Sequence, residues 1–193
     1  MTLSIENALV RRGSAVLLDR VSFQCPAVTF TAICGPNGAG KSTALALLTG
    51  AKATAGRVTS DGDELHALDR EELARARAVV AQQHRLSFPF LVYEVVAMGR
   101  APHQGRSSAA HDAAVIESAL GAMALHSLAE RNYLTLSGGE RQRTMIARAL
   151  AQVWDSPKER SRWLLLDEPT AALDLKYQLN LMRLLRRLAN EGW

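Results

Sequence analysis

The stretch Gly35-Pro36-Asn37-Gly38-Ala39-Gly40-Lys41-Ser42 decides the fold, because it matches the pattern G-x-x-x-x-G-K-[ST] in full. Its glycines tolerate backbone angles that let successive N–H groups face one anion. A helix beginning near Lys41 would add the partial positive charge of its amino end. The stretch therefore predicts a phosphate-binding loop (P-loop), in which Lys41 neutralises the outer phosphates and the Ser42 hydroxyl binds Mg²⁺.

The segments around the P-loop favour this interpretation. A strand is expected over residues 28–34, directly before the loop, and a helix over residues 41–49 that stops at Gly50. Short strands that turn at Gly13 precede both. The alternative, a chance glycine-rich turn, would not need a strand before it and a helix after it.

A second candidate site follows the apolar run Trp163–Leu166, which predicts a buried strand ending at Asp167 and Glu168. This is the form of a Walker B motif. Asp167 can reach Mg²⁺, usually through a water, and Glu168 is placed to polarise or orient the attacking water. Two acids after an apolar strand could instead be a solvated strand end, but a P-loop in the same chain favours the catalytic interpretation.

Strand and helix signals continue along the chain. Strands are expected from Val58, with a turn at Asp61-Gly62, and over residues 78–81, with an Asp69-capped helix between them. An amphipathic helix should follow Asp174. The stripe predicted to face the core consists of Leu175, Leu179, Met182, Leu185 and Leu188.

These signals predict one α/β domain over residues 1–193. Residues 84–135 carry prolines and an alanine-rich helical run that reaches Glu130, but no strand pattern. They indicate an inserted helical lobe, and residues 1–83 and 136–193 then form the β-containing core.

Composition is that of an ordinary folded domain, with 48% hydrophobic and 22% charged residues and a net charge of +4. The charge is mild and spread along the chain, so no nucleic-acid partner is expected. No run of about 18 apolar residues could span a bilayer. The start, MTLSIENALVRR, lacks the apolar stretch of a secretory signal. We expect a cytosolic protein.

The run Leu136-Ser137-Gly138-Gly139-Glu140, upstream of the predicted Walker B strand, resembles the LSGGQ signature of ABC-type ATPases. The resemblance covers the whole chain. It implies a P-loop NTPase core of the ABC type, with an N-terminal antiparallel β part and an inserted helical subdomain. The structural alternative, a Ser137 cap on a helix over residues 141–153, is compatible with the signature.

The resemblance also assigns site residues. Gln82 corresponds to the Q-loop glutamine, and Ala171-Ala172-Leu173-Asp174 to the D-loop at a dimer seam. Glu168 and Gln82 would act in catalysis, and Ser42, Gln82 and Asp167 would hold Mg²⁺. ATP would be held by Gly35, Pro36, Asn37, Gly38, Ala39, Gly40, Lys41, Ser42, Thr43, Ser137, Gly138, Gly139 and Asp174.

Two features depart from the family pattern. The aromatic residue that stacks on adenine is replaced by Val10-Arg11-Arg12-Gly13, where an arginine plane could stack on the base or the arginines could simply be solvated. The family's switch histidine follows one more strand after the Walker B glutamate, and the chain ends at Trp193 before reaching it. On this ground we expect the chain to bind ATP but to hydrolyse it slowly.

The resemblance implies an ATP-binding, ATP-hydrolysing subunit that energises an ABC importer. Its partners would be a second copy of the chain, two transmembrane permease subunits and, indirectly, a periplasmic substrate-binding protein. It would lie at the cytoplasmic face of the inner membrane as a peripheral protein, with the permease docking on residues 88–96. A non-transport ABC ATPase and a weakly catalytic nucleotide-binding module are the alternatives.

Two stretches bear on the cargo. Residues 88–100, with Pro102-His103, resemble importers of iron chelates, haem and cobalamin. The polar insert between Trp154 and Arg162-Trp163 is similar to that of haemin-import ATP-binding subunits. Haemin is therefore the expected cargo, and a ferric siderophore or cobalamin the alternative.

Overall fold

The computed structural model describes residues 2–82, 86–155 and 162–193. Its helices and strands are β1 (Thr2–Arg12), β2 (Ala15–Pro26), α1 (Lys41–Leu48), β3 (Ala55–Ser60), β4 (Asp63–Glu64), α2 (Arg70–Ala76), β5 (Arg77–Val80), α3 (Val92–Ala97), η1 (Met98–His103), α4 (Ala109–Ala122), η2 (His126–Leu128), η3 (Tyr133–Thr135), α5 (Gly138–Val153), β6 (Trp163–Leu166) and α6 (Leu175–Asn190). None of the helices in these ranges combines the length and the apolar character needed to cross a bilayer.

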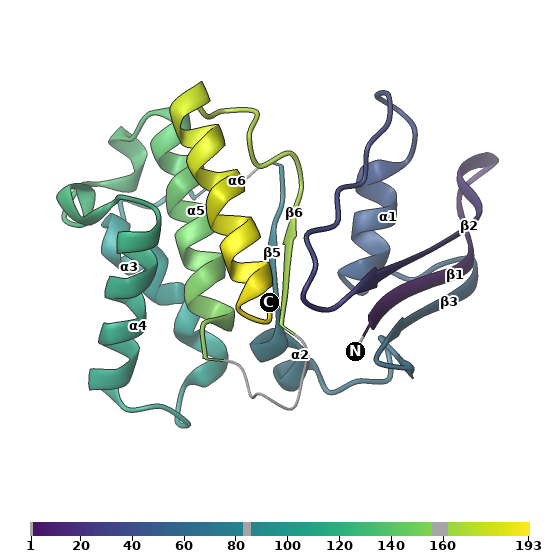
Figure 1. Ribbon diagram of the computed structural model, residues 1–193, viewed down its shortest axis with the longest axis horizontal. Coiled ribbons are helices and arrows are strands. Elements are labelled where there is room, and N and C mark those ends of the chain that lie inside the picture. The colour runs from purple at the N-terminus through teal and green to yellow at the C-terminus, as the bar shows by residue number, and fades with distance from the viewer. Residues whose placement is uncertain (1, 83–85, 156–161) are drawn as a thin grey trace.

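An antiparallel sheet of order β2-β1-β3-β4 forms one half of the molecule and packs beside α1 (Figure 1). Its β1–β2 hairpin turns at Gly13, where φ is +62°. The β3–β4 hairpin turns through Asp61 and Gly62, whose φ angles of 55° and 93° suit a two-residue loop with the twist of the flanking strands. The predicted N-terminal antiparallel part and both of its turns are confirmed.

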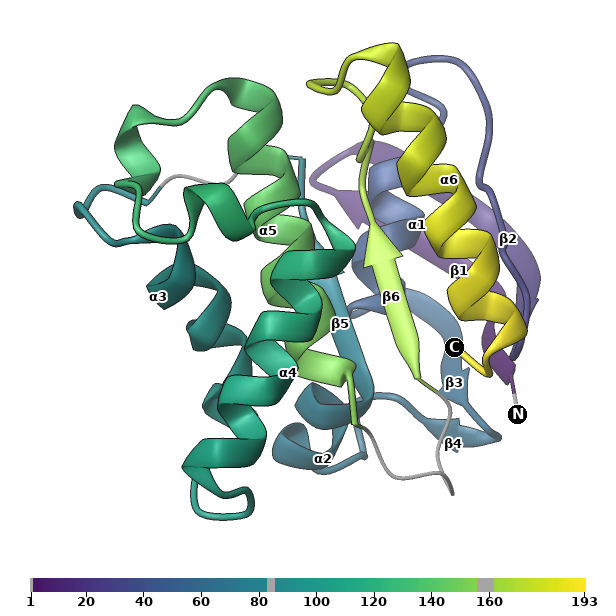
Figure 2. The ribbon, with the colours of Figure 1, turned by 60° about the vertical axis from the view of Figure 1, so that its left-hand side comes forward.

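Strands β5 and β6 form a separate parallel pair in register from Arg77 with Trp163 to Val80 with Leu166. Figure 2 shows the pair running between α5 and the half that contains α1. Alternate residues face the two sides, as in any strand. Trp163 and Leu165 belong to the core beneath α1, whereas Leu164 and Leu166 pack against the core of the helical half. The pair therefore joins the two halves.

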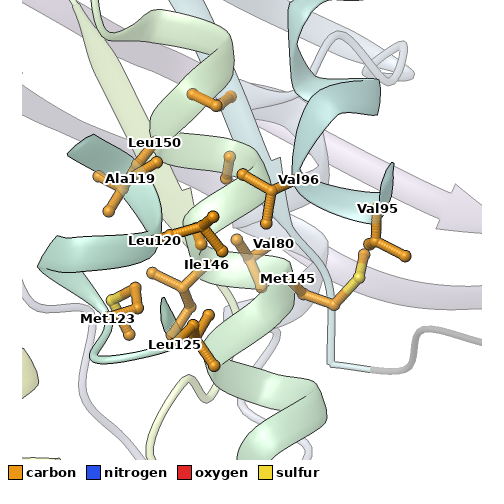
Figure 3. Close-up of a cluster of buried hydrophobic side chains, with 14 of the residues drawn as sticks. Val80, Val95, Val96, Ala119, Leu120, Met123, Leu125, Met145, Ile146 and Leu150 are labelled. Carbon is orange, nitrogen blue, oxygen red and sulfur yellow. The ribbon is translucent and has the colours of Figure 1, made fainter. Parts of the chain in front are cut away.

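The helical half contains α3, η1, α4, η2, η3 and α5. Figure 3 shows its core, in which side chains from α3, α4 and α5 meet Val80 of β5. No strand occurs in residues 86–135, as predicted, and the boundary placed at residue 84 lies outside the described residues. α4 ends at Ala122 rather than near Glu130, because Ala124 has a φ of +52° that does not continue a helix.

Residues 28–34, predicted to be a strand, are not one. Val28, Phe30 and Ile33 are exposed, and a cavity of about 330 Å³ is lined by residues 29–33 together with β6 and α6. Within the described residues β6 pairs with β5 alone. A strand exists only through hydrogen bonds to a neighbouring strand, and residues 28–34 pair with no strand of the described residues.

The apolar stripe predicted for α6 is wrong at three of its five positions. Leu185 and Leu188 are buried, but Leu175, Leu179 and Met182 are exposed by 70%, 49% and 37%. α6 packs on the helical core through a face that also contains Leu181 and Leu184. The three exposed residues face away from that core, and one of them, Met182, lines the cavity beside β6.

Candidate functional site

The candidate site lies where several chain segments begin or end together. Figure 1 shows the amino ends of α1, α5 and α6 at the same end of the molecule as the carboxyl ends of β5 and β6. Gln82 follows β5, and Asp167 and Glu168 follow β6. Helix amino ends carry partial positive charge and free N–H groups, so this end of the molecule is suited to anions.

The P-loop has the backbone that its glycines predict. Gly38 and Gly40 have φ angles of 81° and 87°, and Gly40 caps the amino end of α1. A Cβ atom on Gly40 would lie 2.6 Å from Leu18 Cδ2, so only glycine fits there. Lys41 Nζ donates to the carbonyls of Gly35 at 3.0 Å and Pro36 at 2.9 Å, which holds the ammonium group over the loop. Residues 35–39 are exposed.

Two hydrogen bonds join residues of the site that are far apart in sequence. Ser42 Oγ donates to Asp167 Oδ1 at 3.3 Å, and Gln82 Nε2 donates to Glu168 Oε2 at 2.8 Å. Glu168 also has a φ of +46°, a left-handed conformation that costs a non-glycine residue about 1–3 kcal/mol and gathers at functional sites. The structure thus places a hydroxyl, an amide and two carboxylates beside the exposed loop.

The signature serine caps α5. Ser137 Oγ accepts from the Glu140 N–H at 3.2 Å, and Glu140 Oε2 accepts from the Ser137 N–H at 2.7 Å. The Ser137 backbone and side-chain hydrogen bonds hold the pKa of Glu140 below its usual value. The predicted cap is confirmed, and Ser137 and Gly138 remain exposed at the helix end.

The D-loop lies against the signature in the same chain. Asp174 caps α6 by accepting from the Tyr177 N–H at 2.9 Å. A Cβ atom on Gly139 would lie 3.0 Å from the Ala172 carbonyl oxygen, so the signature backbone approaches the D-loop closely. No hydrogen bond among residues 2–82, 86–155 and 162–193 joins Ser137, Gly138 or Asp174 to the P-loop. The predicted residues therefore form two groups, one at the P-loop and one at the signature and D-loop.

The P-loop helix is also fastened at its far end. Arg77, the first residue of β5, donates through Nη1 to Leu48 O and through Nη2 to Thr49 O, both at 2.9 Å. These are carbonyls of the last turn of α1, which have no partner inside the helix. Burial lowers the pKa of this guanidinium. The strand leading to Gln82 is thus tied to the helix that follows the P-loop.

A buried ion-pair network was not foreseen from the sequence. The Arg100 side chain, only 4% exposed, donates to Asp112 Oδ1 at 2.8 Å, Asp155 Oδ1 at 2.7 Å and Ala151 O at 2.8 Å. His111 also hydrogen-bonds Asp155. Burial alone would raise the pKa of Asp155, but hydrogen bonds from Arg100 and His111 and the arginine charge lower it to about 2. The network fastens η1 and α4 to the end of α5.

Fold and site together define a P-loop ATPase cassette. The chain belongs to the ABC transporter family, whose family model matches residues 18–171. This confirms the predicted family and its ATP-binding, ATP-hydrolysing character.

Two relatives are similar over nearly the whole chain. The haemin import ATP-binding protein HmuV of Gloeobacter violaceus is 44% identical over 184 residues, which cover 95% of this chain and 67% of the relative. The protein of the same name from Pseudomonas entomophila is 44% identical over 191 residues, which cover 98% of this chain and 73% of the relative.

Solved structures of ABC transporters share the fold. The dimeric bacterial ABC transporter cassette MJ0796 has a TM-score of 0.83 at 30% identity, and the match covers 98% of this chain and 83% of that one. A metal-chelate type ABC transporter in an inward-facing conformation has a TM-score of 0.75 at 33% identity, over 97% of this chain and 68% of that one. The predicted fold class is therefore confirmed.

Proposed function

We propose that this chain is the ATP-hydrolysing subunit of an ABC importer and that the importer's cargo is haemin. The observation that carries the catalytic part is the meeting of Ser42 with Asp167 and of Gln82 with Glu168 beside an exposed P-loop. The cargo rests on the two relatives, each 44% identical over nearly the whole chain and each a haemin import ATP-binding protein.

The P-loop group would bind the phosphates. Residues 35–39 are exposed, and Lys41 Nζ can exchange its two carbonyl acceptors for oxygens of the outer phosphates. Arg11 and Arg12, both exposed at the end of β1, are the candidates for contact with the adenine.

A magnesium ion fits the same place. Ser42, Asp167 and Gln82 offer a hydroxyl, a carboxylate and an amide oxygen, the hard oxygen ligands that Mg²⁺ takes. Bound there, Mg²⁺ would neutralise charge that develops on the phosphates. Glu168 accepts a hydrogen bond from Gln82, so the amide can hold the carboxylate in place while the carboxylate polarises the attacking water.

The signature and D-loop would serve a second copy of the chain. Ser137, Gly138 and the amino end of α5 form an exposed, capped anion site that makes no hydrogen bond to its own P-loop within the described residues. A two-fold dimer would place this site of each chain over the nucleotide of the other, and the similar cassette MJ0796 is a dimer. Ser137→Arg should block ATP-dependent dimerisation and leave nucleotide binding to the monomer intact.

An apolar surface follows Gln82 and fits a membrane partner. Phe88, Leu91 and Leu134 are exposed by 68%, 39% and 44%, and Leu91 forms a β-bridge with Asn132. Neighbouring residues of the segment, such as Val92 and Val95, are buried in the helical core. The exposed members would receive a short cytoplasmic helix of one permease subunit, so a dimer of the chain would engage two such subunits. This contact would link the chain to the inner membrane and, indirectly, to a periplasmic substrate-binding protein.

Growth tests separate cargo from mechanism. A strain lacking the gene should fail to grow with haemin as its only iron source, and the wild-type gene, but not Glu168→Gln, should restore growth. The likeness to a metal-chelate type transporter favours ferric siderophore or cobalamin as the second candidate. Unimpaired growth on haemin, with a defect on one of these, would replace the cargo but keep the ATPase.

A further inference from the structure

Arg143 is a charged residue in the second turn of α5 that is only 6% exposed. Its Nη1 donates to the carbonyls of Met123 at 2.9 Å and Ala124 at 2.8 Å, just past the end of α4. Its Cζ lies 4.1 Å from the centroid of the Tyr177 ring, in the first turn of α6. One buried cation therefore joins three helices, and its guanidinium lies over the Tyr177 ring as a cation–π contact requires.

Tyr177 is directly linked to the D-loop. Its N–H donates to Asp174 Oδ1, so the position of the aspartate side chain depends on where Tyr177 lies. The next residue, Gln178, donates through Nε2 to the carbonyls of Thr170 at 3.2 Å and Leu173 at 2.9 Å. Whatever fixes the first turn of α6 thus fixes both the main chain of the D-loop and its aspartate.

Arg143 is linked to the signature in a similar way. Gly139 lies four residues before it, on the same face of α5, since residues four apart are neighbours on a helix. Two contacts therefore lie one above the other on this face. Gly139 approaches the Ala172 carbonyl closely, and one turn later Arg143 contacts Tyr177. Two contacts, one turn apart, hold the start of α5 against the start of α6.

We propose that Arg143 and Tyr177 are positioning residues, which hold Ser137 of the signature and Asp174 of the D-loop at one fixed spacing. Neither residue belongs to the P-loop group, and each acts through the loop next to it. The fixed spacing lets both loops meet the nucleotide-bearing face of a second copy at once, so less conformational freedom is lost on association. The inference rests on the proposed ATP-dependent dimer.

The test compares variants of Tyr177 in a Glu168→Gln background, in which ATP should persist and the dimer should accumulate. Tyr177→Leu removes the ring, and Tyr177→Phe keeps it. We expect Tyr177→Leu to weaken ATP-dependent dimerisation about tenfold, as for a partly buried cation–π contact, and Tyr177→Phe to restore it. Sedimentation measures the dimer, and a fluorescent ATP analogue measures binding to the monomer, which should change less than about twofold in both.

Arg143→Lys and Arg186→Met complete the set. Lysine keeps the charge of Arg143 but cannot serve two carbonyls and the ring at once, so its dimer should be weakened to an intermediate degree. Arg186 is an exposed cation of α6, and its loss should leave dimerisation unchanged.

The outcomes are distinguishable. A Glu168→Gln parent that stays monomeric at high ATP refutes the dimer and this inference with it. A parent that dimerises as tightly as its Tyr177→Leu variant refutes the inference alone. If Tyr177→Leu weakens dimerisation and ATP binding to the monomer equally, the contact of Arg143 with Tyr177 only stabilises the fold. That result would also refute the positioning role.

Discussion

Asp155→Asn should destabilise the chain near neutral pH and leave it almost unaffected in strong acid. The Asp155 carboxylate lies 2.7 Å from Arg100 Nη1, and its pKa is about 2 instead of 3.8. A carboxyl whose pKa is lowered in the folded state adds stability above its unfolded pKa and loses it as the pH falls toward the folded pKa. The shift corresponds to about 2 kcal/mol of unfolding free energy.

Urea denaturation of wild type and Asp155→Asn at a series of pH values measures this difference. It should be constant from neutral pH down to about 5, shrink as the pH falls through the folded pKa, and vanish near about 1, because both side chains are uncharged there. Asp19→Asn, on an exposed carboxylate, is the matched control and should show no such loss. A difference that persists in strong acid would show that Asp155 contributes through packing, and the ion-pair reasoning would be wrong.

Four other changes test the site. Lys41→Ala should weaken ATP binding and abolish ATP turnover in a phosphate-release assay, because the outer phosphates lose their counter-charge. Turnover at the wild-type rate would contradict this. Glu168→Gln should keep ATP binding and lower the hydrolysis rate by about 10²–10⁴, the contribution typical of a general base, and an undiminished rate would remove that role. Gly40→Ala should lower the free energy of unfolding by about 1–3 kcal/mol, because alanine is strained in the left-handed conformation of this residue. A steric clash should lower it further, since the Cβ would lie 2.6 Å from a side-chain atom. Gly38→Ala, whose Cβ meets nothing within 4 Å, is its control in thermal unfolding, and equal losses would contradict the steric part. A cysteine at Phe88 should crosslink to a co-expressed permease, and the absence of any crosslink along residues 88–98 would refute the docking surface.

Much of the site could be predicted from sequence because its chemistry is local. A phosphate cradle needs glycines at fixed offsets, so residues 35–42 could be recognised without a structure. Helix caps are equally local, since a side chain at the cap bonds an N–H only two or three residues away. Ser137, Asp69 and Asp174 were all expected at helix starts, and all three are caps in the structure.

What required the structure depends on neighbours that are distant in sequence. The pairing of Gln82 with Glu168 spans 86 residues and that of Ser42 with Asp167 spans 125. The Arg143–Tyr177 contact joins two helices whose individual patterns reveal only that each is amphipathic. No local rule states which distant side chain a given one will meet, because that depends on how the elements pack.

The same distinction explains two of the wrong predictions. Residues 28–34 lie directly before the P-loop, where a strand is expected, but a strand also needs a neighbour to pair with. Among the described residues they have none, and a cavity lies between them and β6. Helical periodicity placed Leu175, Leu179 and Met182 on an apolar stripe, but which side of a helix is buried depends on where the core lies. Sequence alone determined the chemistry of the phosphate, acid and signature motifs, because each is encoded by residues close together in the chain. Only the tertiary structure decided which strands pair, which helix faces are covered and which motif residues touch, because these follow from contacts between segments that the sequence keeps far apart.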